Sequence, residues 1–251
     1  MNQENVSFAL VERKKFDDEK AHAVAPDIWW VGNFDKAANR SYNPYLLIDG
    51  KEGVLINPGS RADKSHEIIK RKVTSVIDPR LIQHIVLLHN DATRCAATPL
   101  FESITDANVR VYAPSQSIDL IRHYGCKHPL IGLDGGDSVI LKSGRSLTYH
   151  ETPNLDCAGS GFLHDAQSGT IFSGNLFSIP GNEWNLYAQS ESWEGITPAP
   201  SQGLCSKKAF HKALNKIERL SPERICPHQG PILEENIDKY IAFAREIEFN
   251  N

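Results

Sequence analysis

One stretch, Leu81–Cys95, constrains the fold and function of this chain more than any other. Within it, Ile85–Leu88 is an apolar run too short for a helix and typical of a strand buried in a parallel sheet. Polar side chains follow at once: His89, Asp91, Thr93 and Arg94. Because open α/β sheets place their sites at the carboxyl ends of strands, this abrupt change in polarity predicts a functional loop.

The composition indicates a globular protein and excludes several classes of function. Of the 251 residues, 40% are hydrophobic and 23% are charged, and the formal net charge of -4 argues against a general nucleic-acid surface. No apolar run reaches the roughly 20 residues of a membrane-spanning helix, and the polar N-terminus lacks the apolar segment of a signal peptide. The five cysteines, an odd number without close pairs, favour a reduced, cytoplasmic protein.

Strand and helix patterns follow one another in two runs without a linker between them. We expect residues 1–24 to be a polar lead-in and residues 25–251 to form one domain. The expected strands are 27–32, 43–50, 51–58, 85–88, 107–114, 138–141, 146–152, 161–164, 170–173 and 224–227. The expected helices are 68–77, 116–124, 207–220 and 237–247, and a Gly/Trp/Pro-rich loop is expected at 178–203.

Five short motifs, in order along the chain, resemble the metallo-β-lactamase superfamily, in the branch of flavodiiron and oxygen-binding diiron proteins. The motifs are Ser41–Ile48, Ile77–His89, Thr152–Asp156, Gly169–Phe177 and Cys226–Pro231. The loop after the buried strand resembles the branch's H-x-E-x-D-H loop, whose four side chains ligate two irons. The resemblance implies a four-layer αββα sandwich, whereas composition alone indicates only an α/β protein.

Most positions that the resemblance assigns to iron ligands carry other residue types here. These former ligand positions are His89, Asp91, Thr93, Arg94, Asp156, Asn175 and Gln229. His89 keeps the family residue, and Asp91 is one methylene shorter than the family Glu. Asp156 and Gln229 each replace a His, and Asn175 replaces the bridging Asp. A further change, Asn57, replaces the Asp that is typical of the superfamily.

The surviving donors predict at most a single metal ion. His89, Asp91 and Asp156 could hold one Fe, Mn or Zn ion, with water completing its coordination. The second metal position is expected to be lost, because Arg94 cannot deprotonate and its cation would repel a metal. We expect the Arg94 guanidinium to lie there instead, paired with Asp156 or Asp91.

Three more residues adjoin these positions. His228 precedes Gln229 and could swing in as a ligand, although a place beside the ligands or at the surface suits it better. Cys95 and Cys157 fall in the site loops, where a thiolate site is one interpretation and small buried apolar side chains are the simpler one.

The leading functional hypothesis is a binding, sensory or interaction protein with little or no catalysis. No FMN is expected, because the flavodoxin domain of the flavodiiron proteins does not follow this domain in the sequence. The alternative is a mononuclear metal-dependent oxidoreductase or hydrolase that uses His89, Asp91 and Asp156. An oxygen or nitric oxide reductase that accepts electrons from another protein comes third. The resemblance implies a homodimer. The identity of a small-molecule or protein partner is left open, and neither nucleic acid nor a membrane is expected.

Overall fold

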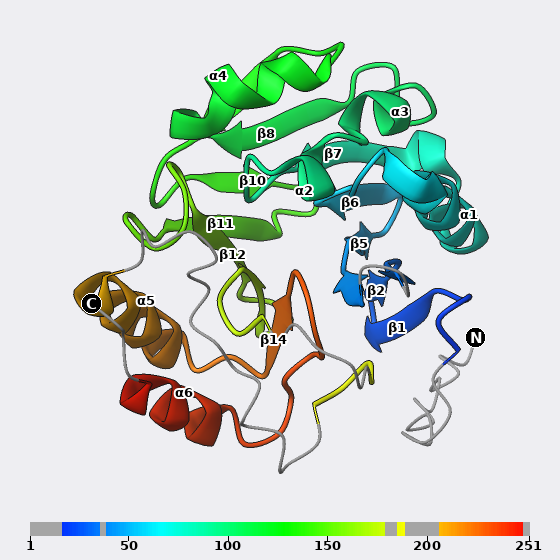
Figure 1. Cartoon of the computed structure of the whole chain (residues 1–251). Helices are drawn as coiled ribbons and strands as arrows, with labels where there is room; N and C mark the ends of the chain where they lie inside the picture. The colour runs from blue at the N-terminus through cyan, green and yellow to red at the C-terminus, as the bar shows by residue number, and fades with distance from the viewer. Residues whose placement is uncertain (1–16, 36–38, 179–184, 189–205, 248–251) are drawn as a thin grey trace.

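Two β-sheets face each other in the computed structural model, with helices on their outer sides (Figure 1). The structure describes residues 17–35, 39–178, 185–188 and 206–247. The first sheet has seven strands in the order β1-β2-β5-β6-β7-β8-β9, and the second has five in the order β10-β11-β12-β13-β14. Strands β3 and β4 form a separate two-stranded ribbon. This arrangement confirms the predicted αββα class.

The strands of the first sheet are β1 (His22–Ala25), β2 (Ile28–Trp30), β5 (Tyr45–Asp49), β6 (Glu52–Ile56), β7 (Ile82–Val86), β8 (Arg110–Pro114) and β9 (Leu130–Leu133). Those of the second sheet are β10 (Ser138–Ile140), β11 (Ser146–Glu151), β12 (Gly161–Asp165), β13 (Thr170–Gly174) and β14 (Arg224–Pro227). The ribbon consists of β3 (Asn33–Asp35) and β4 (Arg40–Tyr42). Strand β7 runs parallel to both β6 and β8, as expected, but it begins three residues before the predicted strand 85–88 and ends at Val86.

The helices on the first sheet are α1 (Ser65–Val76), α2 (Ala92–Cys95), α3 (Thr98–Glu102) and α4 (Ile118–Ile121). Short 3₁₀ turns accompany them at Ala62–Lys64, Pro79–Leu81, Ser115–Ser117 and Arg122–Tyr124. Helices α5 (Lys207–Leu220) and α6 (Ile237–Glu246) cover the second sheet. Among the described residues, none of these helices is long and apolar enough to cross a membrane.

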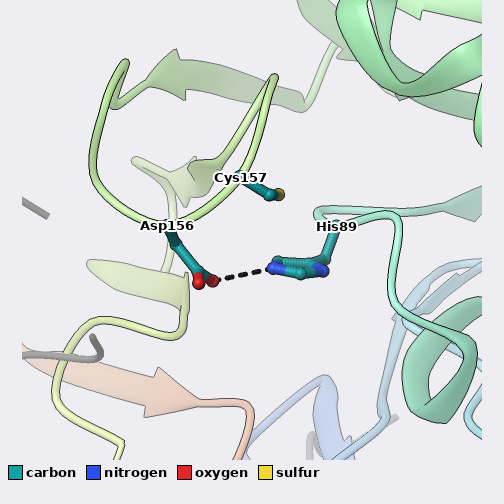
Figure 2. Close-up of side chains that lie close together, drawn as sticks. All are labelled: His89, Asp156 and Cys157. Atoms are coloured by element: carbon teal, nitrogen blue, oxygen red, sulfur yellow. Dashed lines mark hydrogen bonds and ion pairs between the residues drawn. The ribbon is translucent and has the colours of Figure 1, made fainter. Parts of the chain in front are cut away.

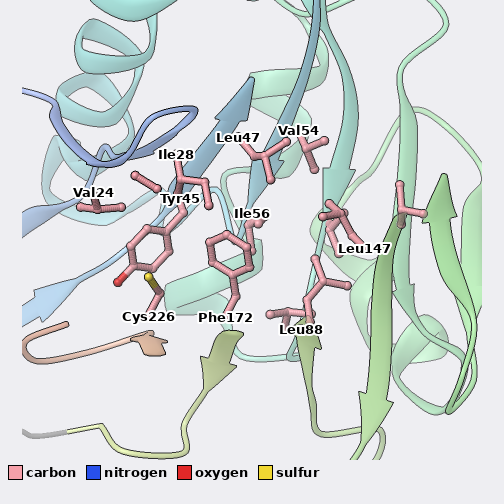
Figure 3. Close-up of a cluster of buried hydrophobic side chains, with 14 of the residues drawn as sticks. Val24, Ile28, Tyr45, Leu47, Val54, Ile56, Leu88, Leu147, Phe172 and Cys226 are labelled. Carbon is pink, nitrogen blue, oxygen red and sulfur yellow. The ribbon is translucent and has the colours of Figure 1, made fainter. Parts of the chain in front are cut away.

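The main core lies between the two sheets (Figure 3). Tyr45 of β5 and Phe172 of β13 meet there with ring centroids 5.4 Å apart. Two further cores join each sheet to its helices: Ile69 and Val73 of α1 pack on the first sheet, and Phe210 of α5 packs on the second. Because burying one such side chain contributes about 1.5–3 kcal/mol, these three cores hold the strand ends that carry the site in place.

Some local details depart from the sequence expectations. The strand β1 begins inside the expected lead-in, and Lys72 of α1 donates a hydrogen bond to the carbonyl of Asp18, so this part of the lead-in is packed. The expected helix 116–124 is one turn of α-helix between two 3₁₀ turns, and Gly125 ends it with φ +82°. Most of the expected loop 178–203 lies outside the described residues.

Candidate functional site

Asn57 holds the start of the loop after β7 by two hydrogen bonds. The amide N–H of Asn57 donates to the carbonyl of Val86 (2.9 Å), and its side-chain Oδ1 accepts the N–H of Leu88 (2.9 Å). Asn57 adopts φ +51°, a left-handed conformation that Asn tolerates better than most residues. This contact sets the direction in which the next residue, His89, leaves the strand.

His89 and Asp156 form the centre of the site (Figure 2). His89 Nδ1 accepts the backbone N–H of Asp91 (3.0 Å), so Nε2 carries the ring proton and donates it to Asp156 Oδ2 (2.7 Å). Burial lowers the pKa of His89, and the hydrogen bond to Asp156 only partly offsets this. The imidazole is therefore neutral near pH 7.

Asp156 is ionised although it is only 7% exposed. Burial by itself raises the pKa of this carboxyl, but the hydrogen bond from His89 and the charge of Arg94 outweigh burial and lower it. Asn175, after β13, donates a second hydrogen bond to the same oxygen. The site thus joins the loop after β7 to two loops of the second sheet.

Asp91 faces its own helix. Its Oδ1 accepts the backbone N–H (2.7 Å) and the hydroxyl (2.5 Å) of Thr93, which makes Asp91 the N-cap of α2. Burial raises the pKa of Asp91, but the two bonds from Thr93 reverse the shift and lower it. This carboxylate is committed to the helix start, and Thr93 acts as a donor.

Cys157 brings a third donor to the pair. Ligand atoms of His89, Asp156 and Cys157 all lie within 4.8 Å of one another. Asp156 and Cys157 are neighbours on one loop, which faces the imidazole of His89 (Figure 2). Burial raises the pKa of the Cys157 thiol to about 11, so it is a thiol at neutral pH. Its position directly after Asp156 is the sequence signal for this role. Cys95 instead donates its S–H to the carbonyl of His89 (2.7 Å).

Arg94 corrects one expectation. It is buried, with 7% exposure, but within the described part of the chain its guanidinium forms no ion pair, and its Nε and Nη1 have no hydrogen-bond partner. The expected pairs with Asp156 and Asp91 are not formed, because those carboxylates accept from other donors. Burial therefore lowers the pKa of Arg94, and the two acids only partly offset the shift.

His228 is the residue whose importance the sequence interpretation underestimated. It follows β14, is 1% exposed, and both of its ring nitrogens are buried without a partner among the described residues. Burial, together with the charge of Arg94, lowers its pKa well below the usual value. The neighbouring Gln229, which stands at the family's ligand position, is half-buried.

These side chains do not fit a two-metal centre. Arg94 places a fixed cation beside the acids, Thr93 uses its hydroxyl as a donor, and the Asn175 amide donates to Asp156. A single divalent ion fits the cluster of imidazole, carboxylate and thiol in both number and kind of donor.

A surface cavity of about 420 Å³ lies along α5 and is separate from this cluster. It is lined by residues 151–154 and by three lysines of the helix: Lys208, Lys212 and Lys216. Lys216 donates a hydrogen bond to the carbonyl of Glu151 (2.6 Å). The cavity contains none of the residues predicted for the site.

Two facing sheets, helices outside, and polar loops at the carboxyl end of β7 define a metallo-β-lactamase-type fold of the flavodiiron kind. The chain belongs to the ODP family beta lactamase family, whose model matches residues 41–230.

Solved structures with this fold cover almost the whole chain. The chemotaxis sensor ODP in a peroxy diiron form has 20% identity and a TM-score of 0.74, covering 91% of this chain and 94% of its own. The apo state of ODP from T. denticola has 19% identity and a TM-score of 0.74, covering 91% and 93%. Rubredoxin oxygen:oxidoreductase from Desulfovibrio gigas has 19% identity and a TM-score of 0.70, covering 90% of this chain and 61% of its own.

Curated relatives are longer than this chain. An uncharacterised protein of Methanocaldococcus jannaschii is 24% identical over 241 residues, covering 89% of this chain and 59% of the relative. An anaerobic nitric oxide reductase flavorubredoxin of an Enterobacter species is 28% identical over 169 residues, covering 61% of this chain and 34% of the relative. The chain therefore spans only part of the length of these relatives.

Proposed function

We propose that this chain is a ligand-binding sensory domain that keeps the diiron scaffold, assembles no two-iron centre and has little or no catalytic activity. The observation that carries the proposal is the buried guanidinium of Arg94, which has no ion-pair partner in the part of the chain that the structure describes. The family assignment and the likeness in fold to a chemotaxis sensor, over nearly the full length of both chains, support it.

The chemistry of Arg94 argues against diiron turnover. A guanidinium stays protonated and offers only donors, so it can neither ligate a metal nor accept a proton. Two-metal catalysis needs both ions positioned at the reacting atoms. One cation-repelling residue at a former ligand position is enough to prevent this, and Asn175 and Gln229 remove two more ionic or imidazole ligands.

A second candidate function, a mononuclear metal site, is favoured by the grouping of His89, Asp156 and Cys157. A bound divalent ion would replace the Nε2 proton of His89 and the thiol proton of Cys157, because metal ligands must be deprotonated. In this grouping Cys157 stands in place of Asp91, whose carboxylate caps α2. Such an ion would supply Lewis-acid or redox chemistry.

Metal content tests both functions. Protein purified without chelator and then offered Fe(II), Mn(II) or Zn(II) should retain no more than one ion per chain by elemental analysis. It should also show no rapid oxygen or nitric oxide consumption when a flavodoxin or rubredoxin donor is supplied. Two tightly held irons per chain together with fast turnover would overturn the sensory proposal.

Matched cysteine variants separate the mononuclear site from adventitious binding. Cys157→Ser and His89→Gln should each reduce the retained metal if the cluster holds it. Cys126→Ser is the control, because Cys126 is half-buried like Cys157 but lies outside the cluster. Equal metal retention by all three variants would place the ion elsewhere.

A further inference from the structure

Two buried side chains at the site have hydrogen-bonding groups that no atom of the described residues satisfies. They are Arg94, through Nε and Nη1, and His228, through both ring nitrogens. Each is more than nine-tenths buried, and the two interact electrostatically with each other. Buried polar groups are almost always hydrogen-bonded, and each one left unmade costs about 1–3 kcal/mol. Two such residues within electrostatic range of each other therefore indicate a missing partner.

The backbones of both residues are fixed before any partner arrives. The Arg94 carbonyl accepts the N–H of Gly59 (2.9 Å). The His228 N–H donates to the carbonyl of Gly174 (2.8 Å), and its carbonyl accepts the N–H of Asn43 (3.0 Å). One residue comes from the loop after β7 and the other from the loop after β14, so the donors approach from different sheets. A partner would bind without the cost of ordering these loops.

From this geometry we infer that Arg94 and His228 bind a small planar oxyanion, such as nitrite, nitrate, bicarbonate or the carboxylate of a small organic acid. A guanidinium presents planar donors that match an oxyanion's oxygens, and the neutral imidazole adds one N–H donor. This inference rests on the proposed ligand-binding function and names the class of its ligand.

The nearby acids accept hydrogen bonds from groups other than Arg94. Asp91 directs Oδ1 to Thr93 at the start of α2, and Asp156 accepts from His89 and Asn175. Neither acid forms an ion pair with Arg94 in the described part of the chain. Arg94 thus keeps unused donors, and an oxyanion on one forked edge of its guanidinium, Nε with Nη2 or Nη1 with Nη2, would accept from Nε or from Nη1.

The test is a titration of metal-free protein with each anion, followed by thermal unfolding. The protein is treated with chelator and desalted, and ionic strength is kept constant with a bulky sulfonate salt. When the anion concentration is about ten times its dissociation constant, binding should raise Tm by about 3–6 °C in a chain of this size. Nitrite, nitrate and bicarbonate represent free inorganic anions, and formate, acetate and benzoate represent carboxylates of increasing size.

Variants assign the effect to the two residues. Arg94→Met keeps the length of the side chain but removes its donors, and it should weaken binding at least about tenfold. Arg94→Lys keeps the charge without the planar donors and should give an intermediate affinity. His228→Gln should also weaken binding. Lys212→Met, at the surface cavity on α5, is the matched control for non-specific anion binding and should behave as wild type.

Two results would overturn the inference. In the first, none of the anions shifts Tm of the wild-type protein, which would mean that water alone satisfies the two residues. In the second, Arg94→Met and wild type respond equally, which would place the anion at the surface. Neither result depends on metal stoichiometry or turnover, so this inference and the proposed function can fail separately. Loss of binding as the carboxylate grows would indicate a free small anion, and retention would indicate the end of a larger acid.

Discussion

Among the residues that the structure describes, two arginines are buried, each with two aspartates nearby, and one of the two is paired. Arg145, just before β11, donates from Nε to Asp165 Oδ1 (3.0 Å), from Nη2 to the other oxygen of Asp165, and from Nη1 to Asp27. Arg94 makes none of these contacts within the described residues. Burial lowers the pKa of both, but in Arg145 the hydrogen bonds to Asp165 and Asp27 more than reverse the shift.

We infer from this difference that Arg145 has a structural role and that Arg94 is free to bind a ligand. Asp27 precedes β2 of the first sheet and Asp165 ends β12 of the second, so Arg145 ties the two sheets together. Arg94 is also buried, but among the described residues its guanidinium forms no ion pair between the sheets. A protein rarely tolerates an unpaired buried charge that has no use, which is why the contrast favours a ligand-binding role for Arg94.

The largest expected effect is on the paired arginine. Arg145→Met should lower the free energy of unfolding by about 3–5 kcal/mol, because Asp165, with 0% exposure, would be left charged and unpaired. Urea denaturation measures the change. Arg71→Met is the control, since Arg71 pairs with Glu19 at the surface and its loss should cost less than about 1 kcal/mol. Equal effects of the two variants would show that Arg145 stabilises the fold no more than a surface arginine does.

A smaller loss is expected within the site, at its satisfied acid. Asp156→Ala should cost about 1.5–3 kcal/mol, because His89 and Asn175 would lose their hydrogen bonds to a charged acceptor. Differential scanning calorimetry can follow this variant beside Asp119→Ala, whose carboxylate is highly exposed and should matter little. No loss at Asp156 would show that its hydrogen bonds contribute little to stability.

Acid should weaken the protein through the site histidines. Burial holds the pKa of His228 well below its usual value of about 6.5, so below that pH the unfolded chain binds a proton that the folded chain does not. The contribution of neutral, buried His228 to the free energy of unfolding is complete above about pH 6.5. It is lost as pH falls below that value, by at most about 1.4 kcal/mol per pH unit. Urea midpoints at pH 7.0 and 5.5 should therefore differ less in His228→Gln than in wild type.

The exposed His123 provides the control for this pH experiment. His123→Gln should keep the wild-type difference between the two pH values. The Arg145 cluster contains no histidine among its described partners, Asp27, Asp165 and Ser168. If His228→Gln leaves the pH difference unchanged, the titration arises elsewhere and the two regions do not differ in this respect.

The smallest effect is expected for Arg94 itself. In a buffer of bulky sulfonate anions, Arg94→Met should change the free energy of unfolding by no more than about 1 kcal/mol, with a gain as the expected sign, because no partner is left unpaired. Chemical denaturation of Arg94→Met and Arg94→Lys gives the comparison. A loss above about 2 kcal/mol in Arg94→Met would show that Arg94 is paired in solution as Arg145 is.

The sequence predicts most strands and helices because their signals are local. The adjacent expected strands 43–50 and 51–58 form the hairpin of β5 and β6, whose two turn residues are Gly50, with φ +60°, and Lys51. The continuous apolar run Ile85–Leu88 overlaps the end of β7, which is a buried parallel strand but begins at Ile82. The short β3, β4 and β9 were not expected, since each has only three or four residues and its stability depends on its neighbours.

The site could be located from the sequence, but the contacts of its side chains could not. Motif order identifies His89, Asp156 and Asn175, and the structure joins them by hydrogen bonds. Which donors a carboxylate accepts depends on three-dimensional competition, so the sequence could not reveal that Arg94 is left unpaired. His228 was underestimated for the same reason, since its burial arises from packing between loops that are distant in the chain.

The hydrogen bond between Asn57 and the end of the strand does not depend on whether a metal ion is bound at the site. Its Oδ1 holds the N–H of Leu88, and an aspartate at this position could accept the same hydrogen bond. Exchanging Asp for Asn removes a negative charge and leaves the exit of the loop where it was. A chain of this fold can therefore lose a charge that would help to hold a metal ion and still keep the backbone path that places His89.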